Sequence, residues 1–145
     1  MEIATIGFTQ RSAEDFFGTL RRAGIRRLVD VRRSNTSQLA AFAKRDDLAY
    51  FLRELVDVEY REAPLLAPTR ELLDAYRKRR ITWSDYAVGY RRLLDEREVH
   101  GRLDRALFAE RAVLLCSEHS PDRCHRRLVV EHLAEHWGDV TAVHL

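Results

Sequence analysis

The stretch Ala112-Val113-Leu114-Leu115-Cys116 decides the fold of this chain. It is apolar at every position, whereas a strand with one solvated face would carry a polar residue at every second position. Continuous apolar strands of this kind belong to parallel sheets that helices cover on both faces. The stretch therefore predicts an α/β protein with a buried central strand.

Other short apolar runs alternate with helical segments along the rest of the chain. Strands are predicted at 2–6, 27–31, 58–62 and 140–144, in addition to 112–116. Helices are predicted at about 13–23, 46–56, 69–79, 83–96 and 98–109, and from Ser120-Pro121 to about Trp137. The alternation predicts an α/β fold in a single compact domain over 1–145. Its central sheet is mostly parallel, with about four to five strands and helices on both faces.

Several of the predicted helices carry signals at their ends. Ser12 and Thr82 are N-cap candidates, because their side chains can accept a hydrogen bond from a backbone N–H of the first turn. Gly24 stands where a residue with positive φ commonly closes a helix. Ser120-Pro121 is typical of a helix start, with proline at the first helical position.

The overall composition excludes several classes of protein. With 46% hydrophobic and 33% charged residues, the chain has enough apolar side chains for a core, and disorder is not expected. A net charge of +2 does not require a polyanionic partner. The two cysteines make no disulfide framework, and neither a signal peptide nor a membrane span is visible. We expect a cytoplasmic protein without membrane contact.

Polar residues follow three of the predicted strands, at the edge of the sheet where ligands of such folds bind. The expected site residues after these strands are Gly7, Thr9, Asp30, Arg32, Glu118, Cys124, His125 and Arg126. Guanidinium groups suit phosphate and carboxylate groups, whereas carboxylates, thiols and imidazoles suit acid–base or nucleophilic chemistry. The edge is therefore predicted to bind an anionic molecule.

Arg126 and Cys124 fall on opposite sides of the last predicted helix. Helical spacing places Arg126 on the buried face, where a guanidinium needs an anionic partner. Two alternatives stay open: a carboxylate of the chain (Asp30 or Glu118), or a bound phosphate or carboxylate held together with Arg32. Cys124 is expected on the solvent side, where the helix N-terminus favours its thiolate.

Cys116 has an unreactive interpretation, and two motif interpretations of the cysteines conflict with the residue spacing. Cys116, at the end of a buried strand, is expected to be a packed thiol. A rhodanese or cysteine-phosphatase loop needs arginine six residues after the cysteine, where this chain has Asp122 or Val130. Cys116, Glu118, Cys124 and His125 offer ligand types that suit zinc, but their spacing matches no common zinc module. We expect neither a metal ion nor a cofactor.

The last helix also contains a formal zinc-peptidase motif. His132-Leu133-Ala134-Glu135-His136 matches the inverted pattern H-x-x-E-H. A third ligand and a substrate cleft normally lie far downstream, and nine residues follow this motif. The two histidines are therefore expected to be polar positions on a surface helix.

Four segments resemble the domain-of-unknown-function 488 family, and the resemblance covers essentially the whole chain. They are TIGFTQ at 5–10, LVDVR at 28–32, SNTSQLAAFAKRDDLAYFL at 34–52, and LLCSE with PDRCHRRLV at 114–118 and 121–129. The resemblance implies a compact α/β domain of prokaryotes. It also implies recurrent polar positions at Thr5, Gly7, Asp30, Arg32, Cys116, Glu118, Cys124, His125 and Arg126. This chain departs from the pattern at Phe8-Thr9, where many members have histidine and serine, and the resemblance implies no catalytic role.

The leading functional hypothesis is a small enzyme that acts on an anionic metabolite of phosphate or nucleotide type. Thr5, Gly7, Thr9, Arg32 and Arg126 would bind the substrate, and Asp30 or Glu118 would act as acid or base. His125 or Cys124 would be the reactive group. All of these residues are expected at one edge of the sheet.

Two further hypotheses come from other classes of protein. A nucleic-acid-binding module would use Arg32, Arg33, Lys44, Arg45 and the arginines at 77–80, with Trp83 or Tyr86 stacking on bases. A structural or partner-binding protein would use an Asp30–Arg126 network to hold the sheet together. The sequence leaves the oligomeric state open.

Overall fold

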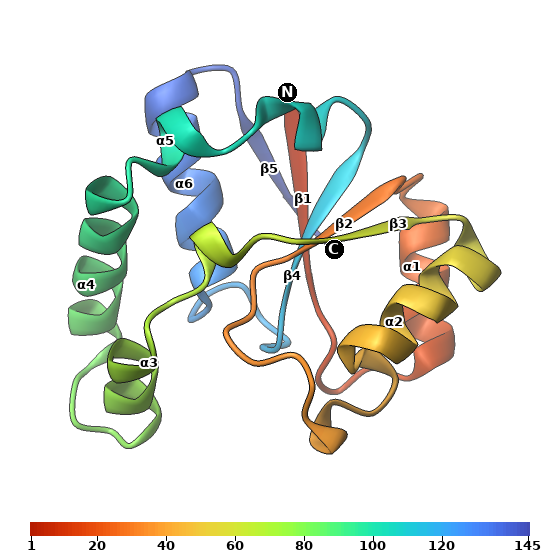
Figure 1. The fold of residues 1–145 in the computed structure, drawn as a ribbon, viewed down its shortest axis with the longest axis horizontal. Coiled ribbons are helices and arrows are strands. Elements are labelled where there is room, and N and C mark those ends of the chain that lie inside the picture. Colours follow the sequence, from red (N-terminus) through yellow and green to blue (C-terminus); the bar gives the residue numbers. More distant parts are fainter.

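All five predicted strands join one parallel sheet. The computed structural model describes residues 1–145 and contains β1 (Glu2–Gly7), β2 (Arg27–Asp30), β3 (Glu59–Glu62), β4 (Ala112–Cys116) and β5 (Thr141–His144). The strand order is β3-β2-β4-β1-β5, and every neighbouring pair is parallel. The predicted parallel sheet is therefore confirmed, and β4 is its central strand (Figure 1).

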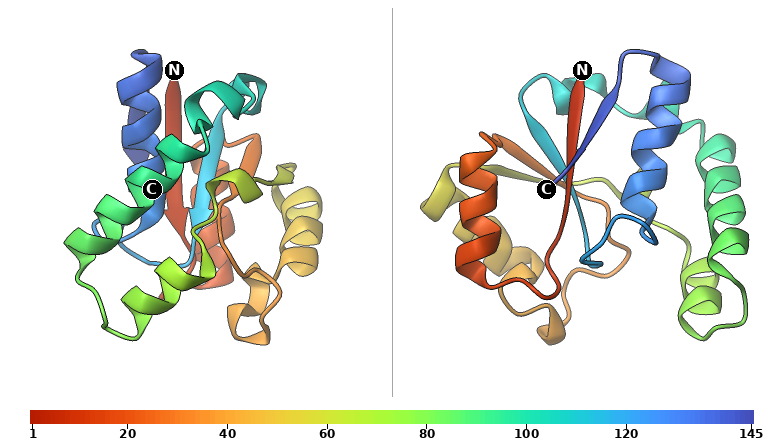
Figure 2. Two further views of the ribbon diagram at one scale, coloured as in Figure 1. Left: turned by 60° about the vertical axis from the view of Figure 1, so that its left-hand side comes forward. Right: turned by 180° about the vertical axis from the view of Figure 1, so that it is seen from behind.

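Helices cover both faces of the sheet, as predicted (Figures 1 and 2). The six α-helices are α1 (Ala13–Arg22), α2 (Arg45–Phe51), α3 (Arg70–Arg77), α4 (Trp83–Glu96), α5 (Val99–Arg102) and α6 (His125–Trp137). The helices α1 and α2 pack on one face, and α4, α5 and α6 pack on the other. No helix combines the length and the apolar character that a membrane crossing needs.

Side chains of β4 alternate between the two core layers. Ala112, Leu114 and Cys116 belong to the layer under α4 and α6, whereas Val113 and Leu115 belong to the layer under α1 and α2. All of them are at most 4% exposed. Burying an aliphatic side chain of this size stabilises a protein by about 1.5–3 kcal/mol. The continuous apolar run is therefore explained by two wrapped faces rather than one.

The predicted caps of α1 and α4 are present. The Ser12 side chain accepts a hydrogen bond from the backbone N–H of Asp15, and Gly24 has a φ of 69° just beyond α1. Thr82 and Asp85 form a reciprocal capping box at the start of α4. These local signals were sufficient to place the helix ends because they need no distant partner.

Two predicted helices have about the predicted bounds but are not α-helical throughout. The segment at 98–109 divides into α5 and a 3₁₀ turn (Arg105–Phe108), because Leu103 is extended and the Asp104 side chain caps the backbone of Ala106. The segment at 46–56 ends in a π-helical turn (Leu52–Val56) that closes on Asp57, a residue with a φ of 53°.

The last helix begins at His125 and not at Ser120-Pro121. Cys124 is its N-cap residue and has extended backbone angles (φ −138°, ψ 139°). The residues between β4 and α6 form a loop instead of a first helical turn. The physical reason is tertiary: the carbonyl groups of Glu118 and His119 in this loop accept hydrogen bonds from the buried Arg126 side chain.

Gly7 lies directly under this loop. It pairs with Cys116 in the sheet, and a Cβ atom at its position would lie 1.5 Å from the Glu118 carbonyl oxygen and 2.7 Å from Arg126 Nη1. Real Cβ atoms essentially never approach a neighbour within 3.0 Å. The glycine is therefore required by close approach of the chain to itself at the carboxyl edge of β1.

We expect Gly7→Ala to destabilise the protein by about 3 kcal/mol or more, because overpacking at a backbone contact forces the loop to move. Gly101→Ala in α5 is the matched control, since no atom lies within 4 Å of a Cβ built there. Urea unfolding of the two variants measures the difference. Equal unfolding free energies would contradict this account of the loop.

Candidate active site

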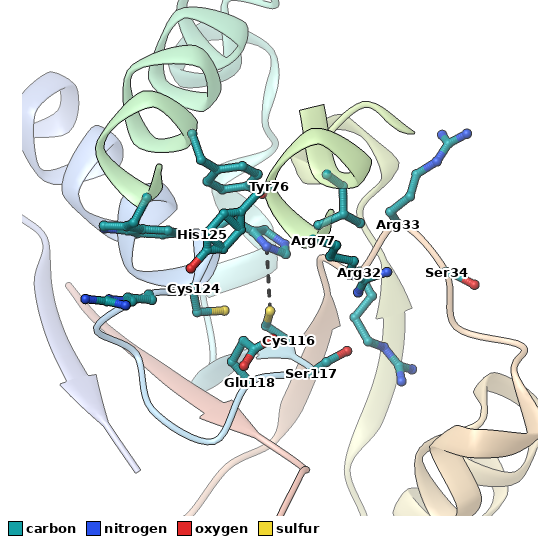
Figure 3. A pocket seen from close by; sticks show the side chains of 14 residues that line it. Arg32, Arg33, Ser34, Tyr76, Arg77, Cys116, Ser117, Glu118, Cys124 and His125 are labelled. Atoms are coloured by element: carbon teal, nitrogen blue, oxygen red, sulfur yellow. Dashed lines mark hydrogen bonds between the residues drawn. The ribbon is translucent and has the colours of Figure 1, made fainter. Parts of the chain in front are cut away.

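A pocket lies at the carboxyl ends of β2 and β4, on the face covered by α4 and α6 (Figure 3). After β1 the chain turns to α1 on one face of the sheet, and after β4 it turns to α6 on the other face. Because the two connections diverge, a crevice opens at this edge. The cavity has a volume of about 60 Å³. It is lined by Arg32, Arg33, Ser34, Leu73, Tyr76, Arg77, Trp83, Tyr86, Cys116, Ser117, Glu118, Arg123, Cys124 and His125.

A cysteine and a histidine are paired in this pocket. Cys116 Sγ, at the end of β4, lies 3.6 Å from Nδ1 of His125, the first residue of α6 (Figure 3). His125 Nε2 lies 2.9 Å from the carbonyl oxygen of Val31. Because a carbonyl group can only accept, Nε2 carries a hydrogen and Nδ1 faces the sulfur. The pair is therefore oriented for proton transfer between the thiol and Nδ1.

The electrostatics of the pair favour a thiolate on Cys116. Burial would raise the pKa of this thiol, but the hydrogen bond from Cys124 and the charge of His125 bring the pKa well below its usual value. Burial likewise opposes the charge on His125, yet the attraction to Cys116 raises its pKa. Both shifts describe a thiolate–imidazolium pair, which is the activated form of a nucleophilic cysteine.

Cys124 does not have the position that helical spacing predicted. It is only 2% exposed, because it precedes the helix and turns inward instead of lying on the solvent side of a first turn. Its sulfur lies beside that of Cys116 (Figure 3). Burial, followed by the hydrogen bond to Cys116, raises the pKa of Cys124. The lower pKa therefore belongs to Cys116, which favours it as the more nucleophilic of the two thiols. The sequence of the chain had indicated only a packed residue at this position.

Asp30 and Arg32 form a buried ion pair beside the pocket. Arg32 Nε and Nη2 each donate to the Asp30 carboxylate at 2.8 Å, and the Arg32 backbone N–H donates at 3.1 Å. Tyr60 and Asn35 donate to the same carboxylate. Burial, and then this hydrogen bond to Asp30, raise the pKa of Tyr60. Asp30 is therefore surrounded by donors within the chain, and its acid–base role stays a prediction.

Arg126 is fully buried, as predicted, but its expected carboxylate partner is absent. Its guanidinium donates to the carbonyl oxygens of Glu118 and His119 and lies 3.7 Å from Cys124 Sγ. The Glu118 side chain is exposed and lines the pocket instead. The predicted ion pair with Asp30 or Glu118, and with it the Asp30–Arg126 network, is therefore wrong, since Asp30 binds Arg32 and the loop supplies carbonyl groups.

The other predicted binding residues lie on β1 or directly after it and do not line the pocket. Thr5 is buried, with Oγ1 2.6 Å from Nδ1 of His144 on the neighbouring strand β5. Thr9 Oγ1 donates to the carbonyl oxygen of Ser117 at 2.7 Å. Thr9 and Gly7 thus contact the loop after β4, whereas Thr5 joins β1 to β5, and the predicted contact of all three with a substrate stays untested.

Three further arginines line the pocket, of which the sequence indicated Arg33 and Arg77 only as nucleic-acid contacts and did not single out Arg123 as a binding residue. Arg33, Arg77 and Arg123 line the cavity, are exposed and form no ion pair within the chain. They come from the loop after β2, from α3 and from the loop before α6. No local signal links these three segments, although Arg123 stands next to Cys124. The mouth of the pocket is consequently positive.

The pocket also brings together three potential metal ligands. Ligand atoms of Cys116, Cys124 and His125 all lie within 4.8 Å of one another, whereas Glu118 does not belong to this group. Thiolates and imidazoles suit zinc. Sequence spacing had argued against a zinc module here, and spacing is a poor guide when two ligands follow a loop that folds back on the strand.

The family model described as "Domain of unknown function DUF488" matches residues 12–133 of the chain. This match confirms the resemblance that the polar segments indicated. No curated protein and no solved structure matches the chain.

We expect iodoacetamide to alkylate Cys116 with a pH midpoint well below the ordinary thiol pKa of about 8.5, because the thiolate persists as pH falls. His125→Asn removes the imidazolium, so the pKa of Cys116 rises and the rate at pH 7 falls by about tenfold or more. Peptide mass spectrometry identifies the modified cysteine. His119→Gln, in the adjacent loop, is the control, and an unchanged midpoint in His125→Asn would contradict the pairing.

Asp30→Asn is expected to destabilise the protein by about 3–5 kcal/mol, because it leaves the Arg32 guanidinium buried without its counter-charge. Asp46→Asn serves as the control. Asp46 pairs with Arg45 at 3.0 Å, but its side chain is 83% exposed, and no measurable change is expected there. Thermal unfolding compares the two, and a small effect at Asp30 would show that the pair is dispensable.

Proposed function

The chain belongs to the family of domains of unknown function DUF488, and for it we propose a cysteine-dependent enzyme that acts on an anionic small molecule. One observation carries the proposal: the Cys116–His125 pair lies in a pocket bordered by arginines that have no partner within the chain. A nucleophile below a positive mouth is suited to a substrate that places a negative group at the mouth and an electrophilic atom at the sulfur.

The pair supplies both halves of a nucleophilic displacement. The Cys116 thiolate uses its electron pair to form a bond to the electrophilic atom of the substrate. The bond from that atom to the leaving group breaks, and the leaving group takes the proton from His125 Nδ1. Neutral His125 then accepts a proton from water while the water oxygen forms a bond to the same atom, and the bond from that atom to sulfur breaks. This step releases the hydrolysed product and restores the thiolate–imidazolium pair. Every proton is thus returned within one cycle.

Arg33, Arg77 and Arg123 are the anion-binding groups in this proposal. The sequence favoured Arg126, but both of its terminal nitrogens already donate to carbonyl groups of the loop, and its Nε is buried. Arg32 contributes its charge at the edge of the pocket, although most of its donors bind Asp30. Guanidinium groups that are free of intramolecular partners lose little on binding phosphate or carboxylate.

The pocket wall favours an anion that carries a flat or apolar portion. Tyr76, Trp83 and Tyr86 form this wall, with ring centroids 5.2–5.6 Å apart. The cavity of about 60 Å³ holds a small group but not a complete nucleotide. A nucleotide-type ligand would therefore insert one end and lay the remainder against the aromatic wall and the arginines.

The nucleic-acid alternative finds less support in the same residues. Tyr86 is 2% exposed and packs between other rings, so it offers no free face to a base. Lys44 and Arg45, which the predicted stripe needed, lie near Asp47 and Asp46. Trp83, the other ring expected to stack on bases, is half-buried in the pocket wall. It can contact a small molecule in the pocket as it stands, whereas base stacking on Tyr86 would require the core to open.

A thermal-shift screen with inorganic phosphate, phosphorylated sugars, carboxylates and nucleotides tests the binding step. A ligand at about 100 times its dissociation constant adds about 2.7 kcal/mol, which is a shift of several degrees for a domain of this size. We expect Arg77→Ala/Arg123→Ala to reduce the shift strongly. Arg92→Ala, an exposed arginine of α4 outside the pocket, should leave it unchanged.

Cys116→Ser separates binding from chemistry. The variant should retain the ligand-induced shift but lose turnover and any covalent adduct seen by intact-protein mass spectrometry. Equal shifts in the double arginine variant and the Arg92→Ala control would contradict the assigned anion site. Full turnover by Cys116→Ser would contradict the assigned nucleophile.

A further inference from the structure

Three histidines gather at the other end of α6, away from the residues that line the pocket. His132 and His136 belong to α6 and His100 belongs to α5. Ring centroids lie 4.0 Å apart for His100 and His136, 4.2 Å for His132 and His136, and 5.4 Å for His100 and His132. His100 Nδ1 lies 3.4 Å from His132 Nε2, and a ligand nitrogen of each ring lies within 4.8 Å of the other two.

The fold holds these rings together through separate contacts. His132 and His136 are four residues apart, so they share one side of α6. Trp137 Nε1 donates to the backbone carbonyl of His100 at 2.8 Å, which anchors α5 against α6. Glu98, with a φ of 51°, turns the chain between α4 and α5 and brings His100 to this place. The juxtaposition is therefore built by tertiary contacts and not by the α6 motif alone.

The contacts made by the outer nitrogens of His132 and His136 leave the inner nitrogens free to bind a ligand. His136 Nδ1 lies 2.9 Å from the carbonyl oxygen of His132, so Nδ1 carries the hydrogen and Nε2 keeps its lone pair. The Asp95 carboxylate lies 3.6 Å from His132 Nδ1, while Nε2 of the same ring faces His100. A carboxylate behind a histidine is the usual outer partner of a metal-binding imidazole.

We propose that His100, His132 and His136 bind a divalent transition-metal ion of the zinc or nickel class. Imidazole nitrogens suit these ions, and three histidines with an open fourth position form a known type of zinc site. Two nitrogens that are each about 2.0–2.1 Å from a tetrahedral zinc ion lie about 3.3–3.4 Å apart. The 3.4 Å between His100 Nδ1 and His132 Nε2 matches this edge.

The exposure of His132 and His136 indicates which ring can adjust to complete the site and where its fourth position opens. His132 is 4% exposed and is fixed by packing, whereas His136 is exposed and its ring can adjust to complete the site. Water would occupy the fourth position on the exposed side. The sequence alone had placed both α6 histidines on the surface, which is correct for His136 and wrong for His132, and it gave no reason to include His100.

Isothermal titration calorimetry with Zn²⁺ and Ni²⁺ tests the proposal. The protein used carries no histidine tag. We expect one equivalent of Zn²⁺ to bind, and His136→Gln and His100→Gln to weaken its affinity by about tenfold or more, since even outer partners of a metal contribute that much. His144→Gln is the matched control, because His144 is exposed on β5, contacts Thr5 and does not belong to this group of three histidines. Asp95→Asn should weaken binding less than either ligand variant.

The thiol cluster of the pocket is the competing zinc site, and Co²⁺ distinguishes the two. Cobalt bound to histidines shows only weak visible bands, whereas cobalt bound to Cys116 or Cys124 adds an intense sulfur-to-metal band in the near ultraviolet. We expect the first equivalent to lack this band and to persist in Cys116→Ser. Absence of binding, unchanged affinity in both histidine variants, or a sulfur band with the first equivalent would overturn the proposal without affecting the proposed enzyme.

Discussion

The buried guanidinium of Arg126 is the interaction on which the rest of the site depends. It binds the carbonyl groups of Glu118 and His119, so the loop after β4 must fold back over the sheet edge and pass above Gly7. Because neutral carbonyl groups accept its hydrogen bonds, the arginine keeps its positive charge. It positions the loop without forming an ion pair with a carboxylate. Loop, glycine and arginine form one structural unit.

The folded-back loop determines the chemistry of the two cysteines. It delays the start of α6 until His125, which places that ring opposite Cys116 and turns Cys124 inward as an N-cap residue. A helix that began at Ser120 would have left Cys124 in solvent and moved His125 along the helix. The opposite pKa shifts, downward for Cys116 and upward for Cys124, thus follow from the position of one helix start.

Positive charge in this protein is divided into two roles. Arg32 and Arg126 are buried and bind groups of the chain, whereas Arg33, Arg77 and Arg123 are exposed at the pocket without partners. The sequence placed the first pair at the site because they stand beside polar motifs. It connected Arg33 and Arg77 only with nucleic acid, because Arg77 lies on a helix far away in the chain. Only the packing of α3 beside the strand ends makes it a neighbour of Cys116.

The sequence by itself determined the α/β class, the strands, the caps at Ser12 and Thr82 and the sheet edge that holds the pocket. These features depend on apolar patterning and on contacts within one helical turn, which a single segment carries. Tertiary structure alone decided where α6 begins, which thiol faces His125, which groups accept hydrogen bonds from Arg126, and that His100 meets the two histidines of α6. The physical reason is that each of these depends on partners from distant segments, and sequence spacing does not encode their distances.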